Sequence, residues 1–279
     1  MTGSTGFTSR RTFLRDLGHR AFALTVIGLA GCAPRAPASA APSASFDPLT
    51  YVGNLDEIEA YWCSDERRPA SPDPPVLGSE LGDAEPSTWA RIGMVGASAY
   101  ILVRGGEATV VDTGPWCTHD VIEDGLTALG LDWSAVGSVV VTHKHPDHWM
   151  ALTDALERAS DAVAYAGAAD IPHIASPRPI VAVGVGDRIM DLAIIPTPGH
   201  TPGHISVHDE AAGVLVVGDA LGYSERQGIF LLPTSEDLPQ AETSLGILAG
   251  LPFDTLLPSH GDAIVGGAWE ELTEYIAGR

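Results

Sequence analysis

The sequence predicts an α+β protein in which β-sheets pack between helices, and three observations support this fold class. Apolar runs of strand length alternate with helical patterns from about residue 90 onward. Two of these runs are joined by Gly105-Gly106, a dipeptide typical of a tight β-hairpin turn. Three more runs follow each other closely, at residues 191–197, 204–209 and 213–219. Strand pairs mixed with single helices fit sheets that are enclosed by helices.

The predicted elements follow in order along the chain. Strands are expected at residues 99–104, 108–112, 138–142, 191–197, 204–209, 213–219 and 255–260. Helices are expected at residues 119–130, 147–159, 235–251 and 267–277. Gly130 is expected to end the first helix. Ser235 is expected to cap the third helix, because a serine hydroxyl can accept a hydrogen bond from a free backbone N–H group.

The first 31 residues resemble an export signal. Arg10 and Arg11 precede an apolar stretch at residues 21–31, which is too short to span a membrane and leads into the sequence LAGC at Cys32. The paired arginines resemble a twin-arginine signal, and LAGC resembles a bacterial lipobox. In such signals the cysteine is lipidated and becomes the first residue of the mature protein. An alternative cut after Ala40 would release a soluble protein instead.

This resemblance implies a location in the bacterial cell envelope. The protein is expected to be exported and anchored through a lipid on Cys32, on the outer side of the cytoplasmic membrane or in the periplasm. Residues 32–48 are almost all Ala, Pro and Ser and are expected to form a flexible tether. Residues 49–89 form a loop-rich lead-in, and the folded domain is expected at residues 90–279. The sequence contains no apolar run of about 18 residues, so no membrane-spanning helix is predicted.

Composition and charge exclude several classes of function. The chain of 279 residues has 36 acidic and 15 basic side chains, a net charge of −21. Such a field repels nucleic acids, and it repels an anionic membrane surface unless a lipid anchor holds the protein there. Hydrophobic residues make up 45% of the chain, so the protein is not expected to be disordered. The oligomeric state is not predicted by these patterns.

Three cysteines are too few for a disulfide framework. After lipidation of Cys32, Cys63 and Cys117 would remain in an oxidising compartment, and we predict that they pair. The alternative is a free, buried cysteine at either position.

Residue types that bind metals gather between Thr142 and His148. His143 and His145 are two residues apart in an extended segment, so both side chains point to the same side and can bind one ion. Asp147 and His148 follow at a predicted helix start and can turn toward a second ion. Four donors in so short a loop exceed what one tetrahedral ion needs. The segment therefore predicts two adjacent metal ions.

Three more donors follow predicted strands. His200 comes after a proline-glycine turn, Asp219 ends the run GVLVVGD, and His260 ends the last strand. Strand ends gather along one edge of parallel or mixed sheets, so we expect these side chains to lie near the segment from Thr142 to His148. A carboxylate at Asp219 could span two cations.

These motifs resemble the metallo-β-lactamase superfamily over about residues 90–265. They are VVDTG, THKHPDH, TPGHTPGH, VGDA and SHGD, in the order that the family shows. The resemblance implies a four-layer αββα sandwich with a two-metal centre at one edge of its sheets. It also implies two divalent metal ions per chain, with zinc as the expected metal and iron or manganese as alternatives.

The resemblance assigns a role to each donor. The first ion takes three histidines, which are His143, His145 and His200. The second ion takes Asp147, His148 and His260, and Asp219 bridges both ions. Asp112 resembles the aspartate that supports the site without binding metal, and His204 is expected to be structural or to support a ligand. Tyr223 lies where some lactonase relatives place a tyrosine that polarises a carbonyl, and an ordinary loop residue is the alternative.

The implied chemistry is hydrolysis. Two ions that share a bridging hydroxide can attack an electrophilic carbon or phosphorus at neutral pH, and Asp147 can steer the hydroxide or carry its proton. We therefore expect a metallo-hydrolase that cleaves an ester, lactone, thioester or related bond of a small molecule outside the cytoplasm. Asp219 stands where true β-lactamases of the superfamily have Cys or Ser, so antibiotic hydrolysis is not the expected activity.

Two alternatives belong to other classes. The first is an iron oxygenase acting on persulfides, which would use the same scaffold with one iron. The second is a non-catalytic metal-binding lipoprotein, and the presence of all seven donors argues against it. The substrate itself is not predicted, because specificity lies in loops such as 170–190 and 221–240 that carry no readable code.

Overall fold

The computed structural model describes residues 76–77, 88–94 and 96–279. All of these residues belong to the compact unit Glu66–Arg279. The predicted signal, the tether, Cys32 and Cys63 lie outside the described residues. Within the described part of the chain, no helix is long and apolar enough to cross a membrane.

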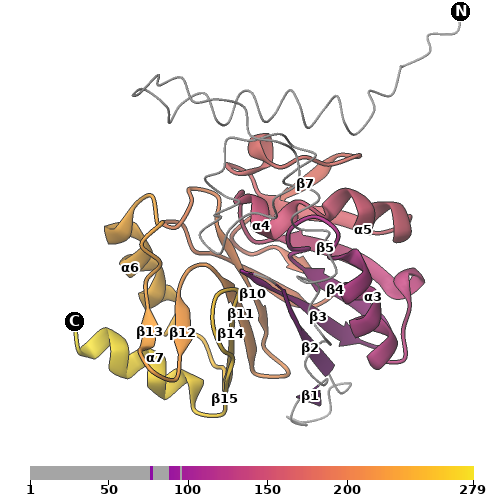
Figure 1. Ribbon diagram of the computed structural model, residues 1–279. Helices are drawn as coiled ribbons and strands as arrows, with labels where there is room; N and C mark the ends of the chain where they lie inside the picture. The colour runs from indigo at the N-terminus through magenta and orange to yellow at the C-terminus, as the bar shows by residue number, and fades with distance from the viewer. Residues whose placement is uncertain (1–75, 78–87, 95) are drawn as a thin grey trace, which may run out of the picture. The chain divides into compact units, whose positions relative to one another are not determined.

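Seven strands form the first sheet in simple sequence order (Figure 1). They are β1 (Val76–Leu77), β2 (Thr88–Gly93), β3 (Ser98–Arg104), β4 (Glu107–Val111), β5 (Val136–Val141), β6 (Val163–Gly167) and β7 (Ile180–Val183). The pairs from β1 to β4 are antiparallel, and those from β4 to β7 are parallel. The ends of β4 and β5 therefore lie at the same edge of this sheet.

The second sheet has six strands in the order β15-β14-β11-β10-β9-β8. They are β8 (Arg188–Ile189), β9 (Leu192–Pro196), β10 (Ile205–Asp209), β11 (Val214–Gly218), β14 (Thr255–Pro258) and β15 (Ile264–Val265). β11 and β14 are parallel, and the other pairs are antiparallel. A small ribbon pairs β12 (Gly222–Ser224) with β13 (Gly228–Phe230).

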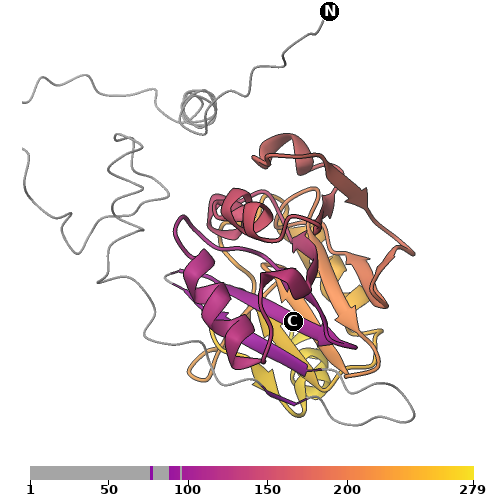
Figure 2. The ribbon, with the colours of Figure 1, turned by 90° about the vertical axis from the view of Figure 1, so that its right-hand side faces the viewer.

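Helices cover the outer faces of both sheets, which gives four layers (Figure 1). The first sheet is flanked by α3 (His119–Ala128), α4 (Pro146–Trp149) and α5 (Leu152–Arg158), and Figure 2 shows α3 in front of it. The second sheet is flanked by α6 (Leu238–Leu248) and α7 (Ala268–Ala277). Short 3-10 turns lie at η3 (Trp133–Ala135) and η4 (Ile171–His173).

Two clusters of buried side chains hold these layers together. One lies between the sheets, where Tyr100 and Val140 of the first sheet meet Ile194 and Val207 of the second. The other lies between the second sheet and its two helices, around residues such as Leu245. The alternation of side chains along each strand feeds both clusters, because neighbouring residues point to opposite faces. The predicted αββα sandwich is therefore confirmed.

The structure differs from the expected elements in several places. The helix expected at 147–159 is divided into α4 and α5, because the N–H of Ala151 donates to the carbonyl of Gly114 instead of continuing the first helix. The first sheet begins before residue 90, with β1 and the start of β2 at Thr88. The regions expected to be loops at 170–190 and 221–240 contain β7 and the ribbon of β12 and β13.

The cap of α6 is a second difference from the sequence prediction. The helix begins at Leu238, and Asp237 caps it by accepting a hydrogen bond from the N–H of Gln240 at 3.0 Å. Pro239 in the first turn suits this start, because its missing N–H needs no partner there. Ser235 is therefore not the cap, and its hydroxyl contacts His200 instead.

Candidate metal centre

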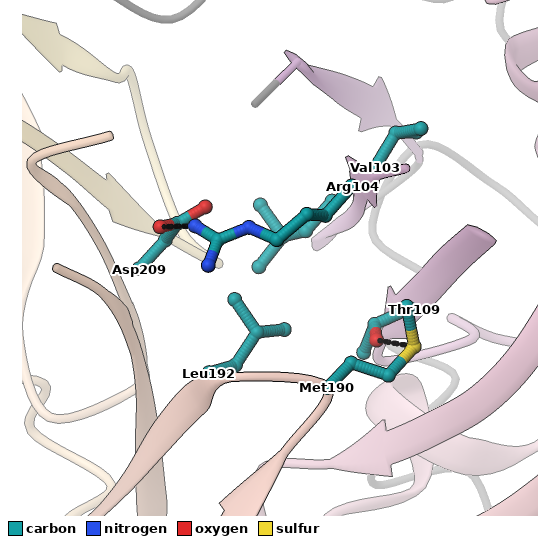
Figure 3. A pocket seen from close by; sticks show the side chains of 7 residues that line it. Val103, Arg104, Thr109, Met190, Leu192 and Asp209 are labelled. Carbon is teal, nitrogen blue, oxygen red and sulfur yellow. Dashed lines mark hydrogen bonds and ion pairs between the residues drawn. The ribbon is translucent and has the colours of Figure 1, made fainter. Parts of the chain in front are cut away.

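The strand ends that carry the predicted donors lie at one edge of the sandwich. Two backbone hydrogen bonds join the sheets there, from the N–H of Ile205 to the carbonyl of Thr142 at 2.9 Å and from Ser98 to Ser259 at 2.8 Å. β5, β9, β11 and β14 all end at this edge, so the loops that follow them face each other. The opposite edge is closed by an ion pair between Arg104 of β3 and Asp209 of β10 (Figure 3).

Three imidazole rings converge in the first group of donors. The Nδ1 atom of His145 lies 3.0 Å from Nε2 of His143 and 2.9 Å from Nε2 of His200. One ring nitrogen carries at most one proton, so it cannot act as a hydrogen-bond donor to both neighbours in any usual arrangement. Three nitrogen lone pairs directed at a common point instead form one face of a tetrahedral metal site.

Asp219 connects this group to the second one. Its Oδ2 atom lies 3.2 Å from Nε2 of His200 and 3.7 Å from Nε2 of His143. The same oxygen lies 3.6 Å from Nε2 of His148 and 3.1 Å from Nε2 of His260. A single carboxylate oxygen thus faces the histidines of both groups, as the bridging role of Asp219 requires.

The second group consists of Asp147, His148 and His260. Oδ2 of Asp147 lies 3.6 Å from Nε2 of His148 and 3.5 Å from Nε2 of His260. The side chain of His148 is fully buried, whereas that of His260 is 28% exposed. The centre is therefore closed around His148 and open to solvent beside His260.

Two buried polar atoms show that these residues fit metal ions. Nε2 of His148 and Oδ1 of Asp219 are buried and have no hydrogen-bond partner among the described residues. An unpartnered buried polar atom costs about 1–3 kcal/mol, and a bound cation would remove that cost. Neutral imidazole and carboxylate are ligands of zinc, iron and manganese, so the donor set suits any of these metals.

Outward hydrogen bonds fix the ring nitrogens that face the centre. The carboxylate of Asp112 accepts from Nδ1–H of His148 at 2.8 Å, so Nε2 is the ring nitrogen that faces the centre. The hydroxyl of Thr142 donates to the same carboxylate at 2.8 Å, so its oxygen can accept from Nδ1–H of His143 at 3.1 Å. Asp112 thus orients ligands of both groups without itself facing the centre, as the resemblance implied.

His204 supports the centre through the backbone. Its Nε2 atom accepts a hydrogen bond from the N–H of Asp219 at 3.0 Å, and its Nδ1 lies 2.8 Å from the hydroxyl of Thr197. Both ring nitrogens are therefore occupied by protein groups. The structure places His204 next to the bridging carboxylate but outside the two groups of candidate ligands.

Burial and charge set the proton affinities of the histidines at the centre. Burial lowers the pKa of His143, and it lowers the pKa of His145 to about 4 and that of His204 to about 3. Burial also opposes the charged form of His148, but the carboxylates of Asp219, Asp147 and Asp112 outweigh it and raise its pKa. The lowered pKa values favour neutral His143 and His145 rings, and the neutral imidazole is the form that binds metal.

Two contacts near the centre were not predicted from the sequence. The hydroxyl of Ser235 lies 3.2 Å from Nδ1 of His200, and Nε1–H of Trp149 donates to the carbonyl of Lys144 at 2.7 Å.

Tyr223 supports the loop of His260, because its N–H donates to the carbonyl of His260 at 3.3 Å. Its ring packs against the cluster beneath α6 and α7.

Comparisons with known proteins place these features in a family. The family model of the metallo-beta-lactamase superfamily matches residues 92–260. A hydroxyacylglutathione hydrolase from Pseudomonas fluorescens is 36% identical over 145 residues, which cover 48% of this chain and 52% of that protein. Thioesterase pkgB from Emericella nidulans is 28% identical over 189 residues, or 66% of this chain and 51% of that protein. The chain thus spans about half the length of these two relatives.

A solved structure supports the same conclusion for the fold. Metallo-beta-lactamase SMB-1 bound to 2-mercaptoethanesulfonate superposes with a TM-score of 0.57 and 18% identity, covering 75% of this chain and 95% of that chain. At this level of identity the likeness concerns the fold alone. The family model covers more than half of the chain, and the matched residues include both groups of donors and Asp219. The chain therefore belongs to the metallo-beta-lactamase superfamily.

Proposed function

We propose that this protein is a metal-dependent hydrolase with a dinuclear centre, acting on an ester, lactone, thioester or related bond of a small molecule. One observation carries the proposal: Oδ2 of Asp219 lies within 3.1–3.7 Å of histidine nitrogens from both donor groups. His143, His145 and His200 would hold one ion, and Asp147, His148 and His260 would hold the other. When bound, two divalent cations supply a water of lowered pKa and a Lewis acid for the scissile carbonyl.

The protein's own residues provide orientation and a proton acceptor. Asp147 is 7% exposed and lies beside the solvent-accessible His260, so its carboxylate can take a proton from water at the open side of the centre. Asp112 and Ser235 hold the ring planes of His148 and His200 through their Nδ1 atoms. Fixed rings lower the cost of reorganisation during reaction.

Thioesters are the first substrates to test. One relative is named a hydroxyacylglutathione hydrolase and another is named a thioesterase, although each is matched over only about half its length. Zinc is the proposed metal, with iron or manganese as alternatives. The net charge of −21 favours neutral or cationic small molecules over nucleic acids.

A screen of the metal-analysed mature protein tests this function. Thioesters, lactones, esters and phosphodiesters are offered at neutral pH, and we expect hydrolysis that a chelator abolishes and added Zn²⁺ restores. One iron per chain with oxygen uptake would instead favour the persulfide oxygenase. Two bound metals without turnover of any class would favour a non-catalytic metal-binding protein.

We also propose that the protein is exported and anchored through a lipid on Cys32. The paired arginines and the sequence LAGC support this location, and both lie outside the described residues. The double variant Arg10→Lys/Arg11→Lys should accumulate in the cytoplasm, as cell fractionation would show. Export of this variant at the parent's level would contradict the twin-arginine signal, and a Cys32→Ser variant that still enters the membrane fraction would contradict the lipid anchor.

A further inference from the structure

We infer that Asp170 is a positioning residue that couples the two loops of the three-histidine group. Asp170 follows β6 and is fully buried, with 0% of its surface exposed. Asp170 belongs to none of the sequence motifs. It is 25 residues or more along the chain from His143, His145 and His200. The inference rests on the metal centre of the proposed function, but not on the reaction.

The carboxylate of Asp170 accepts three hydrogen bonds from the two ligand loops. Its Oδ2 atom accepts from the backbone N–H of Lys144 at 3.0 Å and from the hydroxyl of Thr201 at 2.5 Å. Its Oδ1 atom accepts from the N–H of Gly203 at 2.9 Å. One side chain thus joins the loop after β5 to the loop after β9, which belong to different sheets.

Two of the three donors are direct chain neighbours of candidate ligands of the first ion. Lys144 lies between His143 and His145 in the chain, and Thr201 directly follows His200. A shift of Lys144 or Thr201 would move the neighbouring histidine. Its ring nitrogen would then no longer face the ring nitrogens of the other two histidines. Asp170 has no hydrogen bond to His148 or His260 themselves: Asp112 holds the ring of His148, and the N–H of Tyr223 donates to the carbonyl of His260.

Close packing leaves Asp170 no room to move. A Cβ atom added to Gly203 would lie 2.6 Å from Cγ of Asp170, and one added to Gly167 would lie 1.9 Å from the carbonyl oxygen of Gly203. The end of β6 therefore lies directly against the ligand loop of the second sheet. Glutamate, longer by one methylene, would not fit this space, so the carboxylate position is defined by the backbone.

Removing the carboxylate of Asp170 should weaken one metal site and spare the other. In Asp170→Asn the amide can keep an acceptor toward Lys144 and Thr201, but its NH₂ group would face the N–H of Gly203. Asp170→Ala would lose all three bonds. Loss of a group that orients metal ligands typically costs about 10–100-fold in metal affinity. We expect the three-histidine site to bind metal more weakly in Asp170→Asn than in the parent, and most weakly in Asp170→Ala.

The experiment separates the two sites by removing a ligand from each in turn. His260→Ala leaves the three-histidine site, and His145→Ala leaves the second site. Asp170→Asn and Asp170→Ala are added to each background, and Zn²⁺ affinity is measured by competition with a chromophoric chelator. We expect weaker binding of about 10–100-fold in the His260→Ala background and no measurable change in the His145→Ala background.

Matched variants exclude a general loss of stability. Thr201→Val removes one donor and should weaken the three-histidine site, whereas Thr201→Ser keeps the hydroxyl and should restore it. Thr201→Val also serves if Asp170→Ala does not fold. Asp209→Asn changes another buried aspartate that joins the two sheets, at the opposite edge beside Arg104 (Figure 3), and should leave Zn²⁺ affinity unchanged.

Each outcome decides a different question. Equal weakening of both sites, or unchanged affinity in Asp170→Asn and Thr201→Val, would overturn the inference while leaving the two-metal centre in place. A parent protein that binds none of Zn²⁺, Fe²⁺ and Mn²⁺ would overturn both this inference and the proposed function. Two metal sites without hydrolysis would overturn the reaction alone, because none of these readouts depends on turnover.

Discussion

Two carboxylates lie at the same distance from Nε2 of His148, yet their surroundings give them different tasks. Asp219 is 2% exposed and faces histidines of both groups, so its charge would offset the repulsion between the two proposed cations. Asp147 faces only the second group and lies beside the open side of the centre. The motif order predicted both residues, because each belongs to a short run of sequence. The contacts of Asp170 and Ser235 at the centre were not predicted, since both residues reach it only through tertiary contacts.

Variants of these carboxylates should separate metal retention from turnover. Asp219→Ala removes the shared anion and should lose at least one metal per chain. Asp147→Asn keeps a carbonyl donor but loses the proton acceptor, and turnover should fall by about 10²–10⁴-fold with a smaller loss of metal. Elemental analysis and turnover of the best substrate from the screen measure both effects. Two tightly held metals in Asp219→Ala would show that the bridging assignment is wrong.

His204 should make the metal-free protein sensitive to acid. Its pKa is about 3 in the folded state because of burial, so the unfolded chain takes up its proton first as the pH falls below about 6.5. The stabilisation is complete above pH 6.5 and is lost progressively between pH 6.5 and about 3, by up to about 1.4 kcal/mol per pH unit. His204→Gln keeps an acceptor for the N–H of Asp219 but does not titrate.

Denaturant unfolding of the metal-free parent and of His204→Gln measures this difference. We expect the free energy of unfolding of the parent to fall relative to that of the variant as the pH is lowered from 7 to 4. His204→Gln should also retain two metals, because it lies outside both donor groups. Parallel pH profiles for the two proteins would contradict the role of a buried, neutral His204.

At the scale of elements, the sequence predicted those features that depend on residues close together in the chain. The hairpin of β3 and β4 turns at Gly105 and Gly106, both with positive φ, as the dipeptide indicated. The split between α4 and α5 was not predicted, because it depends on a hydrogen bond from Ala151 to Gly114, distant in sequence. β6 and β7 were not predicted either, since short apolar runs do not distinguish a strand from a loop without their sheet partners.

The end of α3 offers a test of a purely local signal. Gly130 has a φ of 73°, and the N–H of Leu131 donates to the carbonyl of Leu126 at 2.8 Å, which is the Schellman pattern. No atom lies within 4 Å of a Cβ added there, so Gly130→Ala introduces backbone strain alone. We expect a loss of about 1 kcal/mol of stability with unchanged metal content.

A second glycine provides the control for this substitution. Gly184 also has open space around an added Cβ, but its φ lies outside the left-handed region. Gly184→Ala should change the free energy of unfolding by less than about 0.5 kcal/mol. Thermal or denaturant unfolding compares the two variants. A Gly130→Ala variant as stable as the parent would show that the helix can end without its left-handed residue.

At the scale of the whole molecule, the sandwich is closed by different means at its two edges. Arg104 and Asp209 pair at one edge (Figure 3). Backbone hydrogen bonds and Asp170 join the sheets at the edge of the metal centre. Within the first sheet, the loop after β4 is joined to the segment after β5, because the N–H of Thr113 donates to the carbonyl of His148 at 2.8 Å. Cys117 lies in that loop and is disulfide-bonded, with its partner outside the described residues.

The disulfide partner of Cys117 bears on the proposed lipid anchor at Cys32. Cys32 and Cys63 are the two other cysteines, and a lipidated sulfur at Cys32 cannot also form a disulfide, so we predict the pair Cys63–Cys117. Such a loop of roughly 54 residues stabilises the fold by ~3–4 kcal/mol on the chain-entropy model. The mature protein should therefore show no free thiol when it is denatured without reductant. Cys63→Ser should expose one thiol, at Cys117, and lower the free energy of unfolding by that amount. If Cys63→Ser exposes none and Cys32→Ser exposes one, Cys117 pairs with Cys32, and the lipid anchor is excluded together with the predicted pair.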